Sequence, residues 1–157
     1  MNLKNIIFGL GAAYAVYYSA SAERVVFKTS NPRILAHTDD DGFIDLYSLI
    51  SEFFPDIAVI FLMNGSQWSA AELDKAIWAQ FSDVTYKGDR QLHPGQLYPK
   101  MKLLEKQKLI RRAHKNGSQQ LYEINPNAMD KARRIAERTV MILRDIGKLE
   151  KLSSFYV

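Results

Sequence analysis

The sequence contains no cysteine and only three histidines among its 157 residues. Without cysteine, the chain can form neither a disulfide nor a thiolate metal site. The histidines, His37, His93 and His114, lie too far apart to have the spacing of a metal-ligand set, so we expect no metal and no cofactor. The sequence also lacks a phosphate-binding loop and any nucleophile–base spacing, so we expect that the protein is not an enzyme.

The acidic run at residues 39–41 lacks what a calcium loop needs. If Gly42 is placed at the sixth position of such a loop, the twelfth position is Ser48 instead of the bidentate glutamate that calcium loops use. We therefore expect a polar turn whose aspartates cap a helix over about residues 44–54.

No apolar run reaches the roughly 20 residues that a membrane-spanning helix needs. The longest at the N-terminus covers residues 6–20, and the small residues at 19–22 resemble the cleavage site of a secretory signal. We predict that residues 1–22 form an apolar packing helix in a cytoplasmic protein. Membrane contact through this run, as an anchor, remains an alternative, as does a signal segment.

The net charge of +4 is unevenly distributed along the chain. Residues 1–86 carry five Lys/Arg against ten Asp/Glu, residues 87–115 carry nine against two, and residues 116–157 carry seven against five. A basic stretch of this kind indicates a polyanionic partner. The alternative is a solvated basic face without a partner.

The basic stretch has the pattern of a helix followed by a hairpin. The helix is expected over residues 95–108, and two β-prone runs flank the turn 115–118, in which Asn116-Gly117 favours a type I′ turn. Upstream, residues 56–64 are almost continuously apolar, and Ser69 with Glu72 predicts a capping box that opens another helix. The order predicts an α+β, mainly helical fold: a winged helix-turn-helix, which reads the DNA major groove with its second helix.

The basic helix also resembles the recognition helix of PadR-type winged-helix transcriptional regulators. The matching positions are Leu97, Tyr98, Pro99, Met101, Leu104, Glu105, Leu109 and Ile110, and residues 121–124 are similar to the return strand of that family. The resemblance covers about residues 56–147. It implies homodimers that bind double-stranded operator DNA as repressors, often with a small-molecule inducer, and no enzymatic activity. The chain departs from the family at Lys108, where glycine is usual and best tolerates the left-handed conformation of a helix C-cap.

A helical register of 100° per residue separates the inner and outer faces of the basic helix. Leu97, Met101 and Leu104 form the core-facing stripe, and strand alternation would place Arg112 and His114 on one face of the hairpin. The predicted DNA-binding residues are Gln96, Tyr98, Pro99, Lys100, Lys102, Leu103, Lys106, Arg112, Lys115 and Asn116. Glutamine pairs with adenine edges and lysine with guanine acceptors or phosphates, whereas Leu103 could meet a thymine methyl group or a protein surface.

Apolar residues recur with heptad spacing in the C-terminal part of the chain. This seam predicts a dimerisation helix through Ala132, Ile135, Thr139, Ile142, Ile146 and Leu149. Alternatively, the helix packs against the N-terminal apolar run of its own chain. We expect an N-terminal extension over 1–55, with an apolar helix, short strands at 23–30 and 33–37 and a helix, then a winged-helix domain over 56–125 and a dimerisation helix over 126–157.

Two functions follow from these patterns. The first is a dimeric DNA-binding transcriptional regulator that uses helix 95–108 and wing 109–124. The alternative is a winged-helix module for protein interaction or structure, tethered to a membrane by residues 1–22, without specific DNA binding.

Overall fold

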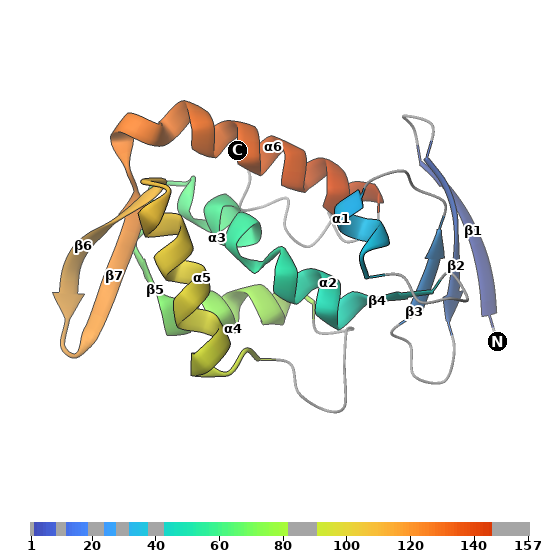
Figure 1. The fold of residues 1–157 in the computed structure, drawn as a ribbon, viewed down its shortest axis with the longest axis horizontal. Coiled ribbons are helices and arrows are strands. Elements are labelled where there is room, and N and C mark those ends of the chain that lie inside the picture. Colours follow the sequence, from blue (N-terminus) through green and yellow to red (C-terminus); the bar gives the residue numbers. More distant parts are fainter. Residues whose placement is uncertain are drawn as a thin grey trace.

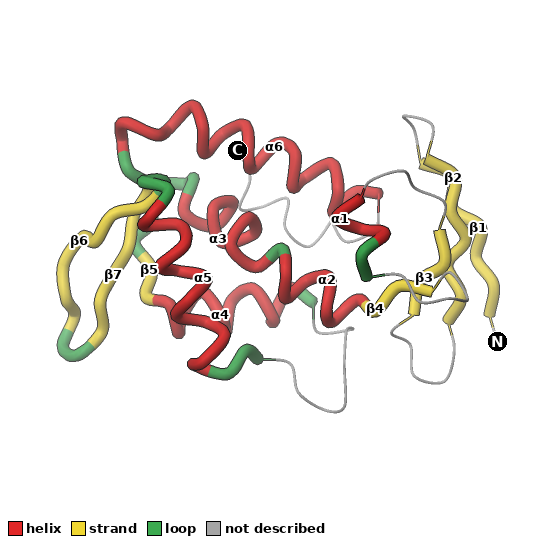
Figure 2. Tube along the Cα trace, viewed as in Figure 1, coloured by secondary structure: helices red, strands yellow, loops and turns green. Residues whose placement is uncertain are grey.

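A computed structural model describes residues 2–8, 12–18, 24–27, 32–37, 43–81 and 91–145 of the chain. The fold is α+β and mainly helical, as the sequence predicted. Helices occupy the middle of the molecule, and an antiparallel sheet lies at each end (Figure 1, Figure 2).

The N-terminal sheet has four antiparallel strands in the order β1-β2-β3-β4. Strand β1 (Asn2–Phe8) pairs along its whole length with β2 (Ala12–Tyr18). Strands β3 (Arg24–Phe27) and β4 (Phe43–Asp45) complete the sheet. The strand predicted within residues 23–30 is therefore confirmed.

The apolar helix predicted over residues 1–22 is wrong, because this part of the chain forms the β1–β2 hairpin. The strands are rich in β-branched and aromatic residues, which favour extended backbone, and Gly9 and Gly11 in the segment between them disfavour a continuous helix. In the described part of the chain, no helix has both the length and the apolar character needed to cross a membrane.

Two short helices flank strand β4 in the chain. Helix α1 (Pro32–Leu35) replaces the strand predicted at residues 33–37, since Pro32 presets the backbone for a first helical turn. Helix α2 (Leu46–Glu52) confirms the helix predicted after the acidic run, and Asp45 caps it by accepting a hydrogen bond from the Ser48 backbone N–H at 3.2 Å.

Helix α3 (Phe54–Leu62) is the centre of the core. Eight of its nine residues are buried, and Asp56 is the exception. A helix that is apolar all round is stable only when it is covered on every side. Helix α3 is covered by α2, by helices α4 (Ala70–Gln80), α5 (Pro94–Lys106) and α6 (Met129–Asp145), and by strand β7 (Gln119–Ile124). Pro55 lies in the first turn of α3, where its missing N–H costs no hydrogen bond.

A single strand of two residues precedes the next helix. Strand β5 (Trp68–Ser69) is too short to be predicted from sequence and pairs with β7 (Gln119–Ile124) through Trp68 and Tyr122. Helix α4 (Ala70–Gln80) then begins with the predicted capping box, in which Ser69 and Glu72 exchange hydrogen bonds of 3.1 Å.

The remaining elements complete the helix-and-hairpin arrangement. Helix α5 (Pro94–Lys106) leads into strand β6 (Ile110–Asn116), which pairs with β7 to form a hairpin, and the second sheet has the order β5-β7-β6. Three helices with a strand between the first two, followed by a hairpin, is the element order expected for a winged helix. We call the β6–β7 hairpin the wing.

The chain then turns through the short helix η1 (Pro126–Ala128) into helix α6 (Met129–Asp145), which packs along α3. The side of α6 that faces α3 is formed by Ala132, Ala136, Thr139, Val140 and Leu143, all buried.

Both tryptophans of the chain belong to this helical core. Trp78 of α4 stacks on Tyr47 of α2 with ring centroids 5.0 Å apart, and Trp68 packs edge-on against Phe61 of α3 at 5.8 Å. These contacts tie α2, α3, α4 and β5 into one packed unit.

Candidate nucleic-acid interface

Helix α5 has one buried and one exposed face. Its first turn begins at Pro94, where a missing N–H costs no hydrogen bond, and Leu97, Met101 and Leu104 enter the core as the register predicted. The opposite side is exposed at Gln96, Tyr98, Pro99, Lys102, Leu103 and Lys106. The exposed set includes two large apolar side chains, Tyr98 at 54% and Leu103 at 46%.

Helix α5 ends in a Schellman motif with Lys108 as its left-handed residue, at φ 58°. The Lys108 N–H donates to the Glu105 carbonyl at 2.9 Å, and the Leu109 N–H donates to the Leu104 carbonyl at 3.1 Å. The side chain of Asn125 then donates to the Lys108 carbonyl at 3.1 Å. The expectation that this cap forms without glycine is confirmed.

The wing turn differs from the predicted type I′ turn. Asn116 pairs with Gln119, so the two turn residues are Gly117 and Ser118, and Gly117 has a φ of 63°. Within the described residues, Lys108 is the sole non-glycine residue with a positive φ, so Asn116 does not adopt the conformation that a type I′ turn would require. A positive φ at the first turn residue alone is the pattern of a type II′ turn.

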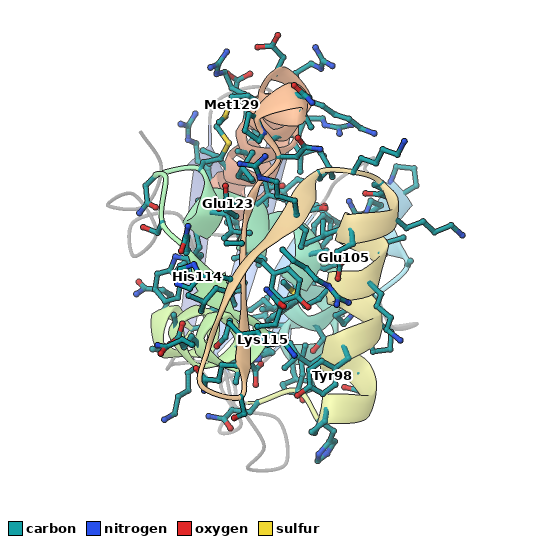
Figure 3. All side chains as sticks on the ribbon, turned by 90° about the vertical axis from the view of Figure 1, so that its left-hand side faces the viewer. Tyr98, Glu105, His114, Lys115, Glu123 and Met129 are labelled. Atoms are coloured by element: carbon teal, nitrogen blue, oxygen red, sulfur yellow. The ribbon has the colours of Figure 1, made fainter. Side chains whose placement is uncertain are left out.

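A bulge between Arg112 and Lys115 interrupts the alternation of β6. Figure 3 shows His114 and Lys115 on opposite sides of the wing, with Lys115 on the side of α5. Arg112 also points toward α5, because its Nε donates to Glu105 Oε2 at 3.3 Å. The prediction that Arg112 and His114 share a face is therefore wrong.

Both wing arginines are held by acidic partners. Arg111 donates through Nε and Nη2 to Glu123 Oε2, at 3.1 and 2.9 Å, and Arg112 is held by Glu105. Of the predicted wing contacts, Lys115 and Asn116 remain exposed near the tip, whereas the charge of Arg112 is partly neutralised. The sequence matched Glu105 to the PadR-type helix but predicted no contact for Glu105 or Glu123, because a carboxylate next to a basic surface gives no local signal of its partner.

Glu105 also reaches the second strand of the wing. Burial raises the pKa of the Tyr122 phenol above its usual value, and the charge of Glu105 and a hydrogen bond to it add to that rise. Glu105 thus connects α5 to Arg112 on β6 and to Tyr122 on β7. This connection links the helix to both strands of the wing.

A groove of about 780 Å³ runs along the other flank of α5, away from the wing. Its α5 wall includes Gln96, Lys100 and Leu103, and its opposite wall, formed by α1, α2 and α3, includes Arg33, Glu52 and Asp56. We call this hollow the α5 groove.

Lys100 lies half-buried in the α5 groove. Burial lowers its pKa, and the negative charge of Glu52 opposes that shift. The Ser51 hydroxyl also lines the groove, and it is buried with no hydrogen-bond partner among the described residues.

The predicted dimerisation residues do not share one surface. Ala132 and Thr139 are buried in their own chain, and the Thr139 hydroxyl donates to the Ile135 carbonyl at 2.8 Å. Ile135 and Ile142 lie half-buried at the edge of that contact. Ile146 and Leu149 fall outside the described residues.

The described residues contain no group of three or more His, Cys, Asp or Glu side chains arranged to hold a metal ion.

Comparisons with known proteins find similar solved structures but no matching family or curated protein. No protein-family model matches the sequence, and no curated protein matches it. Among solved structures, the circadian clock associated protein Pex from Anabaena is similar with a TM-score of 0.47 and 17% identity, over 60% of this chain and 82% of that one. A transcriptional regulator from Clostridium thermocellum is similar with a TM-score of 0.46 and 17% identity, over 66% and 95% of the two chains.

Proposed function

We propose that the protein is a DNA-binding transcriptional regulator that places α5 in the major groove and the wing beside it. The observation that carries this proposal is the exposed cationic face formed by Lys102 and Lys106 of α5 with Lys115 of the wing, which lies on the α5 side (Figure 3). The helix is wide enough to fill a major groove of about 12 Å, so the lysines would meet phosphates or guanine edges.

The resemblance to PadR-type regulators supports the finer form of this proposal. In that form, the protein is a dimeric repressor that recognises a specific operator. Gln96 is exposed on the outer face and is the best candidate for reading an adenine edge. Arg112 would contribute less than Lys115, because it is already paired with Glu105.

The test is DNA binding measured by fluorescence anisotropy over a salt series. If six or so phosphates are contacted, affinity should fall by roughly two to four decades between about 50 and 200 mM salt. Lys102→Glu with Lys115→Glu should weaken binding at least about tenfold and flatten the salt dependence, because each lost phosphate contact removes about 0.9 from the slope.

A matched control reverses two charges elsewhere. Lys131→Glu with Arg134→Glu makes the same change in net charge on exposed positions of α6, and it should leave DNA affinity within about threefold of wild type because exposed charges beyond a Debye length are screened. Equal binding by the Lys102/Lys115 variant and the wild-type protein would refute the assigned face.

A second function is favoured by one observation. Tyr98 and Leu103 are large and exposed on different flanks of α5, and exposed apolar side chains of this size are typical of protein contacts. If the protein is a protein-interaction module, the Leu103→Asp variant should no longer bind its protein partner. The wild-type protein should then show no salt-dependent DNA binding. As a DNA reader, it would keep its general affinity for DNA on Leu103→Ala and change its preference at one base position.

A further inference from the structure

One arginine of the N-terminal region, Arg33, lies at the edge of the α5 groove. Arg33 of α1 donates through Nη1 to Asp56 Oδ2 at 2.7 Å, and its Nε lies 3.8 Å from Glu52 Oε1. The guanidinium also lies 3.8 Å above the centre of the Phe53 ring. We call this set of contacts the Arg33 clamp.

The neighbouring residues of α1 fix the position of the Arg33 clamp. Ile34 is only 1% exposed and belongs to the hydrophobic core. His37 contacts the second carboxylate oxygen of Glu52. The chain that follows Arg33 is therefore held in the core and against Glu52, which places the 46% exposed Arg33 side chain beside both carboxylates.

The two carboxylates of the Arg33 clamp face the flank of α5. Glu52 and Asp56 line the α5 groove together with Gln96, Lys100 and Leu103. A helix in the major groove has a phosphate backbone along each of its flanks, because the groove is about as wide as the helix. The wing lies on one flank of α5, so the second backbone would run along the flank that carries these carboxylates.

We propose that the Arg33 clamp screens Glu52 and Asp56 and thereby sets the affinity of α5 for DNA, an inference that rests on the proposed function. With Arg33 in place, the four charged groups of the groove, Arg33, Lys100, Glu52 and Asp56, sum to zero. Without it, two carboxylates face the phosphates with only Lys100 to offset them. Arg33 is a positioning residue in this scheme, and it gives the N-terminal region a role in DNA binding without direct contact.

The expected size of the effect follows from screened electrostatics. Arg33→Gln should weaken DNA binding about three- to tenfold at about 50 mM salt, where the Debye length exceeds 10 Å. At about 300 mM salt the difference should shrink below about twofold, since charges separated by more than the Debye length no longer interact strongly.

Arg133→Gln is the matched control. Arg133 is an exposed arginine of α6 paired with Asp130 at 3.3 Å, away from the α5 groove. Its replacement removes one positive charge, as Arg33→Gln does, and one ion pair, whereas Arg33→Gln removes two. This control should leave DNA affinity unchanged within about twofold, because Arg133 lies away from the α5 groove. Both variants lower the net charge of the protein by one, so any difference between them depends on where the charge is lost.

Rescue separates screening from simple loss of structure. Glu52→Gln with Asp56→Asn should bind DNA more tightly than wild type, and adding both changes to Arg33→Gln should restore at least wild-type affinity. If Arg33 only held α1 in place, removing its partners would not restore binding. Thermal melting of each full-length variant identifies any that fails to fold. The Glu52/Asp56 variant is an independent test, because it changes the charge of the groove without replacing Arg33.

The outcomes distinguish this inference from the proposed function. If Lys102→Glu with Lys115→Glu abolishes DNA binding while Arg33→Gln and the Glu52/Asp56 variant bind as wild type does, the inference about the Arg33 clamp fails alone. If no variant changes DNA binding, both fail. Weaker binding by Arg33→Gln at low salt, rescued by the two neutralised carboxylates, supports both.

Discussion

At the scale of single residues, Lys108 carries the clearest conformational cost in the described chain. It occupies the left-handed position of the Schellman motif that ends α5, at φ 58°. For a residue with a Cβ atom, this conformation costs roughly 1–2 kcal/mol, whereas glycine adopts it freely. This strained residue lies between the end of α5, the helix proposed to read DNA, and the first strand of the wing.

Lys108→Gly should therefore stabilise the protein by about 0.5–1 kcal/mol, after allowing for the greater freedom of glycine in the unfolded chain. Chemical denaturation with urea would show a higher midpoint at an unchanged slope. Lys106→Gly is the control, because Lys106 is also exposed but lies in the last turn of the helix itself. This second glycine should destabilise the protein by about 0.5–1 kcal/mol, and a similar loss from Lys108→Gly would show that the cap does not require the left-handed conformation.

At the scale of elements, Glu105 fixes how α5 and the wing meet. Its carboxylate is shared by Arg112 and Tyr122, so one residue of the helix holds both strands of the hairpin. A wing that is held at a fixed angle pays less entropy when it meets a ligand than one that is free to swing.

The Tyr122 phenol reports on this connection. Because the folded protein raises the pKa of Tyr122, it holds the phenolic proton more tightly than the unfolded chain does. The stability from this group is complete below pH about 10 and is lost as the pH rises through the pKa of the folded state. Glu105→Gln removes the negative charge and should lower the pKa of Tyr122, as measured by ultraviolet difference absorbance of the phenolate in a pH titration.

Two further variants assign and control that titration. Tyr122→Phe identifies which step of the absorbance change belongs to Tyr122. Glu123→Gln removes the next carboxylate along β7, which is paired with Arg111, and it should move the Tyr122 titration less than Glu105→Gln does. Equal shifts in both variants would contradict a specific role for Glu105.

At the scale of the whole molecule, α6 limits where a second copy could bind. Ala132 and Thr139 are occupied within their own chain, so we propose that a homodimer would use the edge formed by Ile135 and Ile142. Light scattering should then give twice the chain mass of 18.0 kDa.

Ile135→Asp with Ile142→Asp should convert such a dimer to a monomer. Burying each isoleucine contributes roughly 1.5–3 kcal/mol, so the dissociation constant should rise at least about a hundredfold. Met141→Asp is the control, since Met141 is 45% exposed and lies on a different side of α6. Circular dichroism establishes that each variant keeps its helices, and a dimer that survives the double change would rule out this edge.

The features predicted from sequence are those with local causes. Ser69 and Glu72 are three residues apart and predicted the start of α4, and Leu97, Met101 and Leu104 predicted the inner face of α5. The hairpin was also predicted, although its turn is displaced by one residue from the expected Asn-Gly centre.

The features that were missed depend on partners far along the chain. Strand β5 is two residues long and exists only through its pairing with β7. The contact between Arg33 and Asp56 spans 23 residues and has no periodic signal. The β1–β2 hairpin was predicted as a helix because apolar length alone does not distinguish a buried helix from paired strands.

The placement of the two tryptophans has a consequence for how unfolding is followed. Trp68 and Trp78 both pack within the unit formed by α2, α3, α4 and β5, whereas Tyr14, Tyr17 and Tyr18 lie in strand β2 of the N-terminal sheet. Tryptophan emission therefore follows the loss of the helical core and is insensitive to the N-terminal sheet. If tryptophan emission and backbone circular dichroism change at different denaturant concentrations, the two sheets of this molecule belong to different cooperative units.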